Sequence, residues 1–271
     1  MTTAKKEKKE PKIINVKPQY DNKQKELKSV YVNGALNYQV TYDNKVIYLN
    51  ESLDDAMTAY NKAGLLKPKL KNWYDHATDD WINATRNADM SKHYDMFLNN
   101  IEKSAEILDI GCGSGRDTKY FIEHGFKTTS LDNSKKMCNL TKKYAGKKSN
   151  VLNVDILEID ETHTFDAIWA MASFVHMQEN TLKSAFEKIN KILKPGGVFY
   201  TCLKEVANEY VDDLGRIYPK TSVHMLKEHL TNAGFVDIET YSTDDKLGRG
   251  NNWINLLARQ PGHDLSMSPE F

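Results

Sequence analysis

The sequence has few cysteines, and no two of them stand at metal-binding or redox spacing. Cys112, Cys138 and Cys202 are far apart in 271 residues, and no Cys-x-x-Cys pair or Cys/His cluster is present. This pattern excludes a zinc finger, and the odd number argues against a disulfide framework. We therefore predict no metal site and a reducing compartment, the cytoplasm.

Long hydrophobic runs and a net charge are also missing. No apolar stretch approaches the roughly 20 residues that a membrane span needs, and no signal-peptide pattern opens the sequence. Lys plus Arg and Asp plus Glu number 37 each, so no overall charge draws the chain to nucleic acid or to an anionic membrane. We predict no membrane association.

The charge is nevertheless unevenly distributed. Residues 1–29 hold nine lysines and four acids, an excess of five positive charges, which leaves the remainder acidic by five. A lysine-rich segment with little apolar surface cannot offset the entropy lost on ordering, so we predict a disordered tail over 1–29. Such a tail either improves solubility or acts as a nucleic-acid arm.

A small unit comes after the tail. Three short β-rich runs, at 29–32, 37–42 and 45–49, precede a segment that Asn50 can cap as a helix and Gly64 can end. The pattern predicts a βββα appendage over residues 30–65. It is too small to hold a large core alone.

The rest of the chain alternates between strand and helix patterns. Residues 72–103 are mostly helical, with Ser91 as a plausible cap, and strands then alternate with helices from residue 106 onward. Such alternation predicts an α/β fold, a mostly parallel sheet with helices on both faces. The last two strands lack an intervening helix, which predicts an antiparallel pair. We place this domain at 66–260 and a C-terminal tail at 261–271.

The first strand of this domain runs into a glycine-rich turn, in the stretch EILDIGCGSGRDTKYF at 106–121. Gly111, Gly113 and Gly115 occupy alternate positions before a helix, where bare backbone can approach a ligand and helix N–H groups can meet an anionic end. A dinucleotide fingerprint requires Gly-x-Gly-x-x-Gly, which this spacing does not match. A tight turn without a ligand is the alternative interpretation.

Acidic residues end the next two predicted strands. Asp132 lies directly after the second strand, where a carboxylate can accept both hydroxyls of a ribose, and Asp155 lies after the third. Asp155 is placed to accept a hydrogen bond from an adenine amino group, with the Ile156 N–H near the ring. Each acid alone could be a solvated loop residue. Matched features at consecutive strand ends favour a nucleoside-binding edge, because ligands of such sheets bind beyond the carboxyl ends of the strands.

With these features, residues 72–260 resemble the class I S-adenosylmethionine-dependent methyltransferases, and finer features resemble the tellurite-resistance-type branch. The resemblance rests on DMSKHYDMFL (89–98), GCGSGRDTKYF (111–121), FDAIWAMASFVHM (165–177), LKPGGVFY (193–200) and GRGNNWINLLAR (248–259). It implies a Rossmann-like seven-stranded sheet whose last strand is antiparallel. It also implies S-adenosyl-L-methionine as the cofactor and a methyltransferase activity.

The resemblance further implies roles for individual residues. The predicted cofactor site comprises Asp109, Gly111, Cys112, Gly113 and Gly115 for the methionine part, Asp132 and Asn133 for the ribose, Asp155 and Ile156 for the adenine, Ala170 at the end of the fourth strand, and Tyr74 and Met90 in a helical lid. His176, after the fourth strand, is the candidate general base. Its alternative role is to order its own loop by hydrogen bonding.

The residues after the fourth strand narrow the choice of methyl acceptor. Amino-group methylases of DNA usually carry an Asn/Asp/Ser-Pro-Pro-aromatic run there, whereas this chain has Met171-Ala-Ser-Phe. No cysteine comes after a proline, as cytosine-carbon methylases require. A small molecule or a metalloid is therefore the first choice.

Residues 30–65 carry a second, weaker resemblance, to the plant ethylene-response-type DNA-binding domain, through KVIYLNESLDDAMTAYNKAG. That domain normally presents arginines and tryptophans, which this stretch lacks, so direct guanine readout is excluded. Together with the lysine tail it could still hold nucleic acid through phosphates. A nucleic-acid-directed methyltransferase, and a cofactor-binding protein without turnover, are thus the alternatives.

Overall fold

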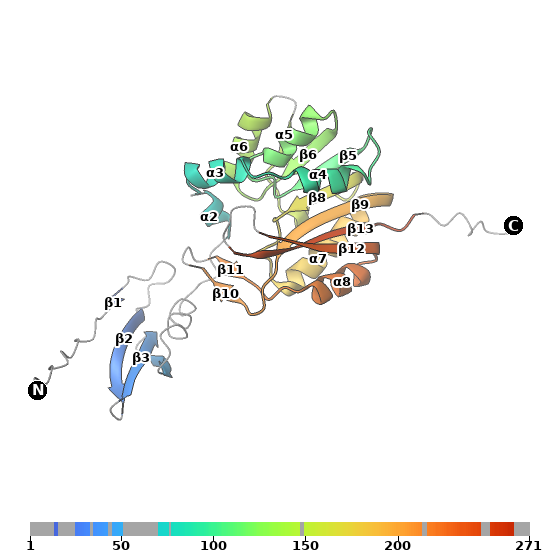
Figure 1. The fold of residues 1–271 in the computed structure, drawn as a ribbon. Coiled ribbons are helices and arrows are strands. Elements are labelled where there is room, and N and C mark those ends of the chain that lie inside the picture. Colours follow the sequence, from blue (N-terminus) through green and yellow to red (C-terminus); the bar gives the residue numbers. More distant parts are fainter. Residues whose placement is uncertain are drawn as a thin grey trace, which may run out of the picture. The chain divides into compact units, whose positions relative to one another are not determined.

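A computed structural model describes most of the chain and divides it into two compact units (Figure 1). The first unit is Met1–Lys69 with Tyr210–Arg216, and the second is Leu70–Glu209 with Ile217–Phe271. The described residues are 14–15, 25–32, 35–42, 45–50, 70–75, 77–146, 149–212, 216–244 and 250–262.

The first unit contains an antiparallel sheet of four strands in sequential order. Its strands are β1 (Ile14–Asn15), β2 (Lys25–Val32), β3 (Ala35–Tyr42) and β4 (Lys45–Asn50). β2, β3 and β4 correspond to the three strand patterns of the predicted appendage. β1 and the start of β2 lie within residues 1–29, where the composition predicts a disordered tail. The helix expected after Asn50 falls outside the described residues.

The second unit is built on a seven-stranded sheet, in the order β12-β13-β9-β8-β5-β6-β7. Its strands are β5 (Glu106–Ile110), β6 (Lys127–Leu131), β7 (Asn150–Leu152), β8 (Phe165–Met171), β9 (Leu193–Lys204), β12 (Val236–Asp244) and β13 (Asn252–Arg259). β5 to β9 pair in parallel, and β13 is antiparallel to both β9 and β12. This confirms the predicted sheet, including its antiparallel last strand.

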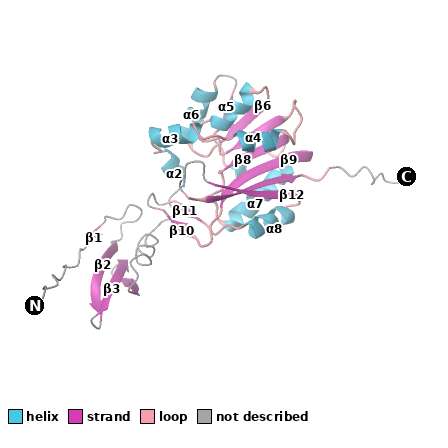
Figure 2. Ribbon diagram, in the orientation of Figure 1, coloured by secondary structure: helices cyan, strands magenta, loops and turns pink. Residues whose placement is uncertain are grey.

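Helices cover both faces of this sheet (Figures 1 and 2). The helices are α2 (Leu70–Asp75), α3 (Asp79–Arg86), α4 (Ser91–Leu98), α5 (Arg116–Glu123), α6 (Lys135–Ala145), the 3₁₀ turn η1 (Ile156–Glu158), α7 (Glu179–Ile192) and α8 (Val223–Asn232). In Figure 1, α4, α5 and α6 lie above the sheet and α7 and α8 below it. Two short strands, β10 (Tyr210–Val211) and β11 (Ile217–Tyr218), come after β9 in the chain.

Alternating residues of the strands build two hydrophobic cores, one on each face. Leu108 and Ile110 of β5 pack on the side of α7 and α8, whereas Ile107 packs with Phe97 and Trp169 on the side of α4 and α5. The period of two results from strand geometry, in which successive side chains point to opposite faces. Each fully buried side chain of this size contributes about 1.5–3 kcal/mol by leaving water.

Helix starts show where local signals were sufficient. Ser222 is the N-cap of α8, and its Oγ accepts the Met225 N–H at 3.3 Å. The expected Ser91 cap of α4 is wrong. Ser91 is the first helical residue after Met90, and the Asp89 carboxylate accepts the Ser91 N–H at 3.0 Å. The Asp89 carboxylate thus accepts a backbone N–H that has no acceptor within the helix, because the first turn of a helix has no preceding carbonyls.

The order of strands fixes where a ligand can bind. The chain runs from β5 through β6 to β7 on one side, then returns to place β8 on the other side of β5. Ligands of open α/β sheets bind beyond the carboxyl ends of the strands at such a switch point. The glycine turn after β5 and the loop after β8 lie at this point.

Candidate functional site

The glycine turn leaves β5 with a backbone that favours glycine at every second position. Gly111, Gly113 and Gly115 have φ angles of 68°, 54° and 90°, in the left-handed region that other residues adopt only with strain. The N–H groups of Gly111 and Cys112 both donate to the Leu131 carbonyl, at 2.8 and 3.0 Å. These bonds fasten the turn to the end of β6.

The three glycines serve different purposes. A Cβ at Gly111 would lie 2.2 Å from Ser173 Oγ, and one at Gly115 would lie 2.8 Å from Thr141 Cα. Both positions are therefore required by packing within the protein. At Gly113 the nearest atom would be 3.8 Å away, the Gly111 carbonyl oxygen. Gly113 thus faces open space with bare backbone, which is what close approach of a ligand requires.

Asp132 joins the glycine turn to the loop after β6. One carboxylate oxygen accepts the Gly113 N–H at 3.0 Å, and the other accepts the Ser134 N–H at 2.8 Å. Burial raises the pKa of this carboxyl above its ordinary value of 3.8. A carboxylate offers about four acceptor positions, so two remain for the hydroxyls of a ribose.

The residues predicted for the adenine end lie beside Asp132. Asp155 caps η1 by accepting the Leu157 N–H at 3.0 Å, and its other oxygen is 3.5 Å from Asn133 Nδ2. The side chain of Ile156 is buried in the core, at 3% exposure, so it can offer a ligand only its backbone. The structure brings Asn133 and Asp155 together from the ends of two adjacent strands.

Two predicted site residues turn their side chains into the protein. Asp109 is buried and accepts the Thr118 hydroxyl at 2.6 Å. Burial and then the neighbouring Asp117 raise the pKa of Asp109 to about 8. Cys112 is buried, with its sulfur 3.4 Å from the Thr141 hydroxyl. Both side chains shape the packing below the turn, and their contact with a cofactor stays a prediction.

The end of β8 contributes residues that sequence reasoning missed. Ala170, the predicted contact, is fully buried within the strand. The edge is formed two residues later by Ala172, which has a φ of +53° although it is not glycine, and by Ser173, which backs Gly111. A left-handed alanine costs about 1–2 kcal/mol. No sequence signal marks it, because alanine normally avoids this conformation.

The two predicted lid residues have different surroundings. Met90, at the start of α4, is 7% exposed and belongs to the same core cluster as Phe97 and Trp169. Tyr74, in α2, has its ring 6.2 Å from the ring of His176. Tyr74 is therefore brought toward the end of β8, whereas Met90 mainly packs the core. Their contact with a cofactor stays a prediction.

The helix α2 is attached to the start of α6. The Ser134 hydroxyl donates to Asp75 at 2.5 Å, and the Lys136 N–H lies 3.4 Å from the same oxygen. The Lys136 ammonium also donates to the Ala77 carbonyl at 2.7 Å. These contacts tie the lid helices to the loop that holds Asp132.

Two arginines link α3 and the glycine turn reciprocally. Arg86 of α3 donates twice to the Ser114 carbonyl, at 3.1 and 2.8 Å, and Arg116 at the start of α5 donates to the Thr85 carbonyl at 3.0 Å. Arg116 also forms two bonds with Asp117, at 2.6 and 2.9 Å. The Asp117 side chain of this pair is buried, and the Arg116 side chain is half-buried, at 21% exposure.

Asp117 is the centre of a buried polar cluster. Besides Arg116, it accepts the Tyr94 hydroxyl at 2.5 Å and the Trp169 indole N–H at 2.9 Å. Burial alone favours the neutral carboxyl, yet the Arg116 charge and these donors hold the pKa of Asp117 below 3.8. The cluster fastens the first turn of α5, and hence the glycine turn, to α4 and β8.

His176 is 8% exposed and lies among aromatic rings. Its Nδ1 is 2.7 Å from the Ile217 carbonyl oxygen, which only accepts, so Nδ1 carries the hydrogen. In the neutral ring, Nε2 is then the acceptor. The His176 ring lies 4.5 Å from that of Tyr218 and 6.2 Å from that of Tyr74. This tautomer is the one that a general base acting through Nε2 needs.

Comparison with known proteins agrees with this geometry. Residues 107–197 match the family model described as "Methyltransferase domain", and this segment runs from β5 through the glycine turn to the start of β9. A sterol 24-C-methyltransferase of Gibberella zeae is 31% identical over 129 residues, covering 45% of this chain and 33% of its own. The enzyme of the same name from Saccharomyces cerevisiae is 26% identical over 179 residues, covering 58% and 46%. The chain spans less than half the length of these relatives.

Solved structures share the fold. The 1,6-didemethyltoxoflavin-N1-methyltransferase of Burkholderia thailandensis, with 1,6-didemethyltoxoflavin and S-adenosylhomocysteine bound, superposes with a TM-score of 0.60 at 19% identity, covering 86% of this chain and 99% of its own. Phosphoethanolamine N-methyltransferase 2 of Haemonchus contortus, in complex with S-adenosyl-L-methionine, gives 0.56 at 18% identity, covering 70% and 60%. Residues 107–197 are thus similar in sequence to a methyltransferase domain, and the fold of the second unit is similar to that of these methyltransferases.

Three further observations concern metal sites, disulfides and membrane spans. In the part of the chain that the structure describes, His, Cys, Asp and Glu residues do not gather in threes or more as a metal site would require. No disulfide joins Cys112, Cys138 and Cys202, all three of which are described and buried. Among the described helices, none is both long and apolar enough to cross a bilayer.

Proposed function

We propose that the chain is an S-adenosylmethionine-dependent methyltransferase that acts on a small molecule. The observation that carries this proposal is the arrangement around Gly113. Its backbone faces open space, its N–H is held by Asp132, and Asp155 lies at the next strand end. Bare main chain flanked by two carboxylates suits a ligand with a close-fitting tail, a diol and an exocyclic amine. Adenosyl cofactors have these three features.

The residues of the chain have separate tasks in this proposal. Asp132 accepts hydrogen bonds from the ribose hydroxyls, Asp155 accepts one from the adenine amino group, and the backbone around Gly113 borders the methionine part. The bound cofactor supplies a methyl group already activated by a sulfonium, so the hard chemistry is its own. The protein positions the acceptor and excludes water, and positioning can lower a barrier by up to roughly 7–11 kcal/mol in favourable cases.

His176 is the proposed general base for an acceptor that must lose a proton. Its Nδ1–H is held by the Ile217 carbonyl, so Nε2 is the nitrogen with the lone pair that would take a proton from a hydroxyl or amine. The acceptor side of the site is then the β8 side, where Tyr74 and Tyr218 lie near the imidazole. An acceptor that does not have to lose a proton before it reacts needs no general base, and the protein then only has to position it next to the methyl group.

A small acceptor is supported by the relatives. By their names, these act on a sterol, on 1,6-didemethyltoxoflavin and on phosphoethanolamine, which differ too much to identify one acceptor for this chain. A metalloid acceptor, the tellurite-resistance-type branch, a cytoplasmic location and the DNA-binding resemblance of residues 30–65 all stay predictions.

Transfer of a labelled methyl group tests the proposal directly. The purified full chain, incubated with methyl-labelled cofactor and separate metabolite, protein and nucleic-acid fractions, should label the metabolite fraction. An Asp132→Ala variant serves as the control for enzyme-dependent labelling. Label in nucleic acid alone would favour the nucleic-acid-directed alternative. Cofactor binding without any transfer would leave a binding protein, and binding of a nicotinamide or flavin instead would overturn the assignment.

A further inference from the structure

The helix α6 differs from the other helices of its unit in charge. Its sequence, KKMCNLTKKYA, contains four lysines and no acid, whereas α7 has three lysines and two glutamates. Lys135, Lys142 and Lys143 are exposed. In the described part of the chain, no carboxylate forms an ion pair with any of these three.

Five lysines elsewhere in this unit have a carboxylate at short range. They form the pairs Lys119–Glu123 on α5, Lys127–Glu106, Lys183–Glu179 on α7, Lys188–Glu161 and Lys194–Asp166. Like charges on one helix repel, and helix surfaces normally offset this with acids three or four residues away. The α6 row lacks that compensation, so an anion from outside the chain would relieve the repulsion.

The lysines of α6 lie in two adjacent rows along the helix. Lys135 and Lys142, and likewise Lys136 and Lys143, are seven residues apart, which is two turns or roughly 10 Å along the axis. A groove of about 520 Å³ runs beside them, lined by Asp75, Lys135, Lys136, Asn139, Leu140 and Lys143. Asp75 is the acid of this lining, and the Ser134 hydroxyl already donates to it.

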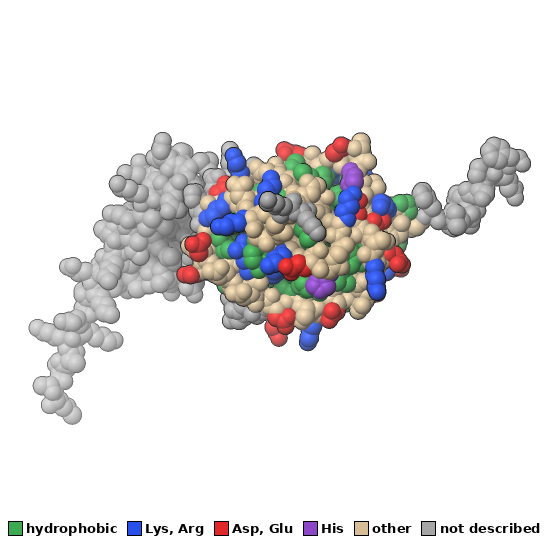
Figure 3. Space-filling view, turned by 90° about the horizontal axis from the view of Figure 1, so that it is seen from above, with side chains coloured by type: hydrophobic (Ala, Val, Ile, Leu, Met, Phe, Trp, Pro, Cys, Tyr) green, Lys and Arg blue, Asp and Glu red, His purple; other side chains and the backbone are tan. Residues whose placement is uncertain are grey.

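Cations from α3 and α5 add to this basic surface at the last turn of α6. Tyr144 is 37% exposed, with the Arg86 guanidinium 4.0 Å and the Lys119 ammonium 4.5 Å from its ring centre. In Figure 3, Lys and Arg side chains gather toward the side of this face where α3 and α6 lie in Figure 1. We call the surface formed by Lys135, Lys142, Lys143 and Tyr144 the α6 lysine face.

We propose that the α6 lysine face binds the phosphate backbone of a nucleic acid. Extended rows of ammonium groups suit a strand whose charges repeat every few ångströms, and phosphate contacts of this kind supply affinity without sequence readout. A membrane surface is less suited, because binding to one also needs apolar side chains to insert. Tyr144 is the large apolar residue exposed on α6, and two cations cover its ring.

This surface is separate from the proposed methyl-transfer site. The α6 lysine face lies on the helix between β6 and β7, whereas His176 comes after β8 on the other side of β5. Nucleic-acid binding there would recruit the protein whatever the acceptor. The proposal therefore does not depend on the proposed function.

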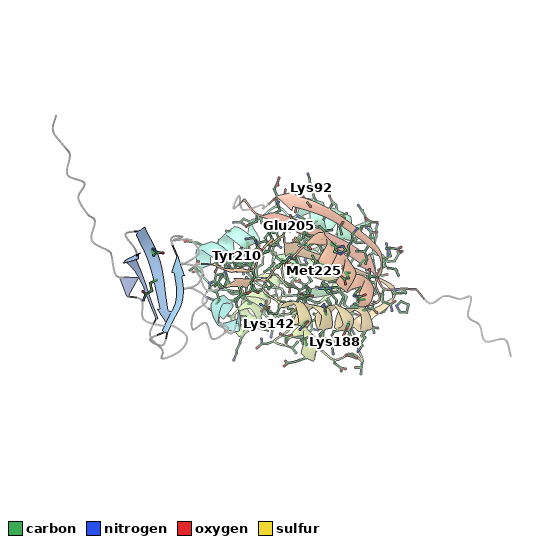
Figure 4. All side chains as sticks on the ribbon, turned by 90° about the horizontal axis from the view of Figure 1, so that it is seen from below. Lys92, Lys142, Lys188, Glu205, Tyr210 and Met225 are labelled. Carbon is green, nitrogen blue, oxygen red and sulfur yellow. The ribbon has the colours of Figure 1, made fainter. Side chains whose placement is uncertain are left out.

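Binding of labelled 20-nucleotide RNA and DNA, single- and double-stranded, tests the proposal by fluorescence anisotropy between 50 and 300 mM salt. The full chain is compared with the triple variant Lys135→Gln, Lys142→Gln, Lys143→Gln. The matched control is Lys183→Gln, Lys188→Gln, Lys191→Gln on α7, with the same change of charge; Figure 4 labels Lys142 and Lys188 on these two helices.

The α6 variant should bind at least about tenfold more weakly at 50 mM salt, and its log–log salt slope should fall by about 2 to 3, roughly 0.7–0.9 per lost phosphate contact. The α7 variant should match the parent chain, and S-adenosylhomocysteine affinity should be equal in all three. Equal losses in both triple variants, no loss in either, or absence of binding by the parent chain would overturn the proposal. Phosphatidylserine vesicles serve as a second probe. If the α6 variant loses binding to these vesicles but not to nucleic acid, the proposal is overturned and the α6 lysine face is a membrane-binding surface.

Discussion

The guanidinium of Arg86 donates two hydrogen bonds to one backbone carbonyl, that of Ser114, at the apex of the glycine turn. Arg86 ends α3, and Ser114 lies 28 positions later between Gly113 and Gly115. The guanidinium thus fixes the orientation of the Ser114 carbonyl, in the residue that directly follows Gly113. A helix of the predicted lid thereby supports the backbone of the proposed cofactor site.

Replacing Arg86 with alanine should weaken cofactor binding. Hydrogen bonds to a charged group contribute about 1.5–3 kcal/mol, and we expect part of this to appear as a roughly tenfold loss of S-adenosylhomocysteine affinity in calorimetry. The matched control is Lys119→Ala, which removes the other cation over Tyr144 but does not touch the turn. An Arg86→Ala variant that is folded and binds with unchanged affinity would show that the turn is rigid without this support.

The glycines should respond differently to alanine. Both Gly111→Ala and Gly113→Ala incur about 1–2 kcal/mol of left-handed strain, but only at Gly111 does the new Cβ collide with Ser173. Gly111→Ala should therefore lose more stability in denaturant titrations, and Ser173→Gly should restore part of it. Gly113→Ala should lose cofactor affinity out of proportion to its stability. If the ratio of affinity loss to stability loss is the same in both variants, Gly113 is not a contact of the cofactor.

Asp132→Ala should lose a charge-assisted pair of hydrogen bonds to the ribose, about 1.5–3 kcal/mol or roughly 10- to 100-fold in affinity. It should also lower the melting temperature, because the Gly113 and Ser134 N–H groups lose their acceptor. Asp160→Asn, in an exposed turn, is the charge control. Titration calorimetry that shows equal affinity for the parent chain and a folded Asp132→Ala variant would remove Asp132 from the site.

For His176, two substitutions separate a base from a structural role. Asparagine can keep the donor to the Ile217 carbonyl but has no equivalent of Nε2, whereas alanine loses both. If His176 is the base, both variants should lower kcat by about 10²–10⁴ with cofactor affinity retained. Rescue of kcat by asparagine would assign His176 to loop ordering.

The buried carboxylate of Asp117 should give stability a pH dependence. Its pKa is lower in the folded protein than in the unfolded chain, so its contribution is complete well above pH 4 and is lost as pH falls through the lowered value. At pH 7, Asp117→Asn should destabilise by up to about 3–5 kcal/mol, because the half-buried Arg116 charge is left without its carboxylate partner. The difference from the parent chain should shrink below about pH 4. A constant difference between pH 7 and pH 3 would contradict the lowered pKa.

Spacing in the sequence predicted the sheet and much of the proposed edge. Gly113, Asp132 and Asp155 each lie just after a strand pattern, so alternation alone places them at one edge of a parallel sheet. The structure confirms the sheet and brings these residues together.

The sequence did not reveal surroundings that come from distant parts of the chain. Arg116 is half-buried against Asp117 and the Thr85 carbonyl. Met90 is packed into the core and Ala170 is fully buried within β8, and their contact with a cofactor stays a prediction. Nothing local distinguishes these outcomes, because each depends on which helix or strand lies opposite.

Local patterns were enough to define the succession of strands and helices, the glycine turn and the carboxylates at the strand ends, because hydrophobic period and turn chemistry act over a few residues. Only the folded chain shows that Gly113 faces open space while Gly111 and Gly115 are enclosed, and that Arg86 supports Ser114. The same is true of the exposed α6 lysines, which stand without acidic partners in the described part of the chain. These features depend on which elements pack together, and packing joins residues that the sequence keeps far apart.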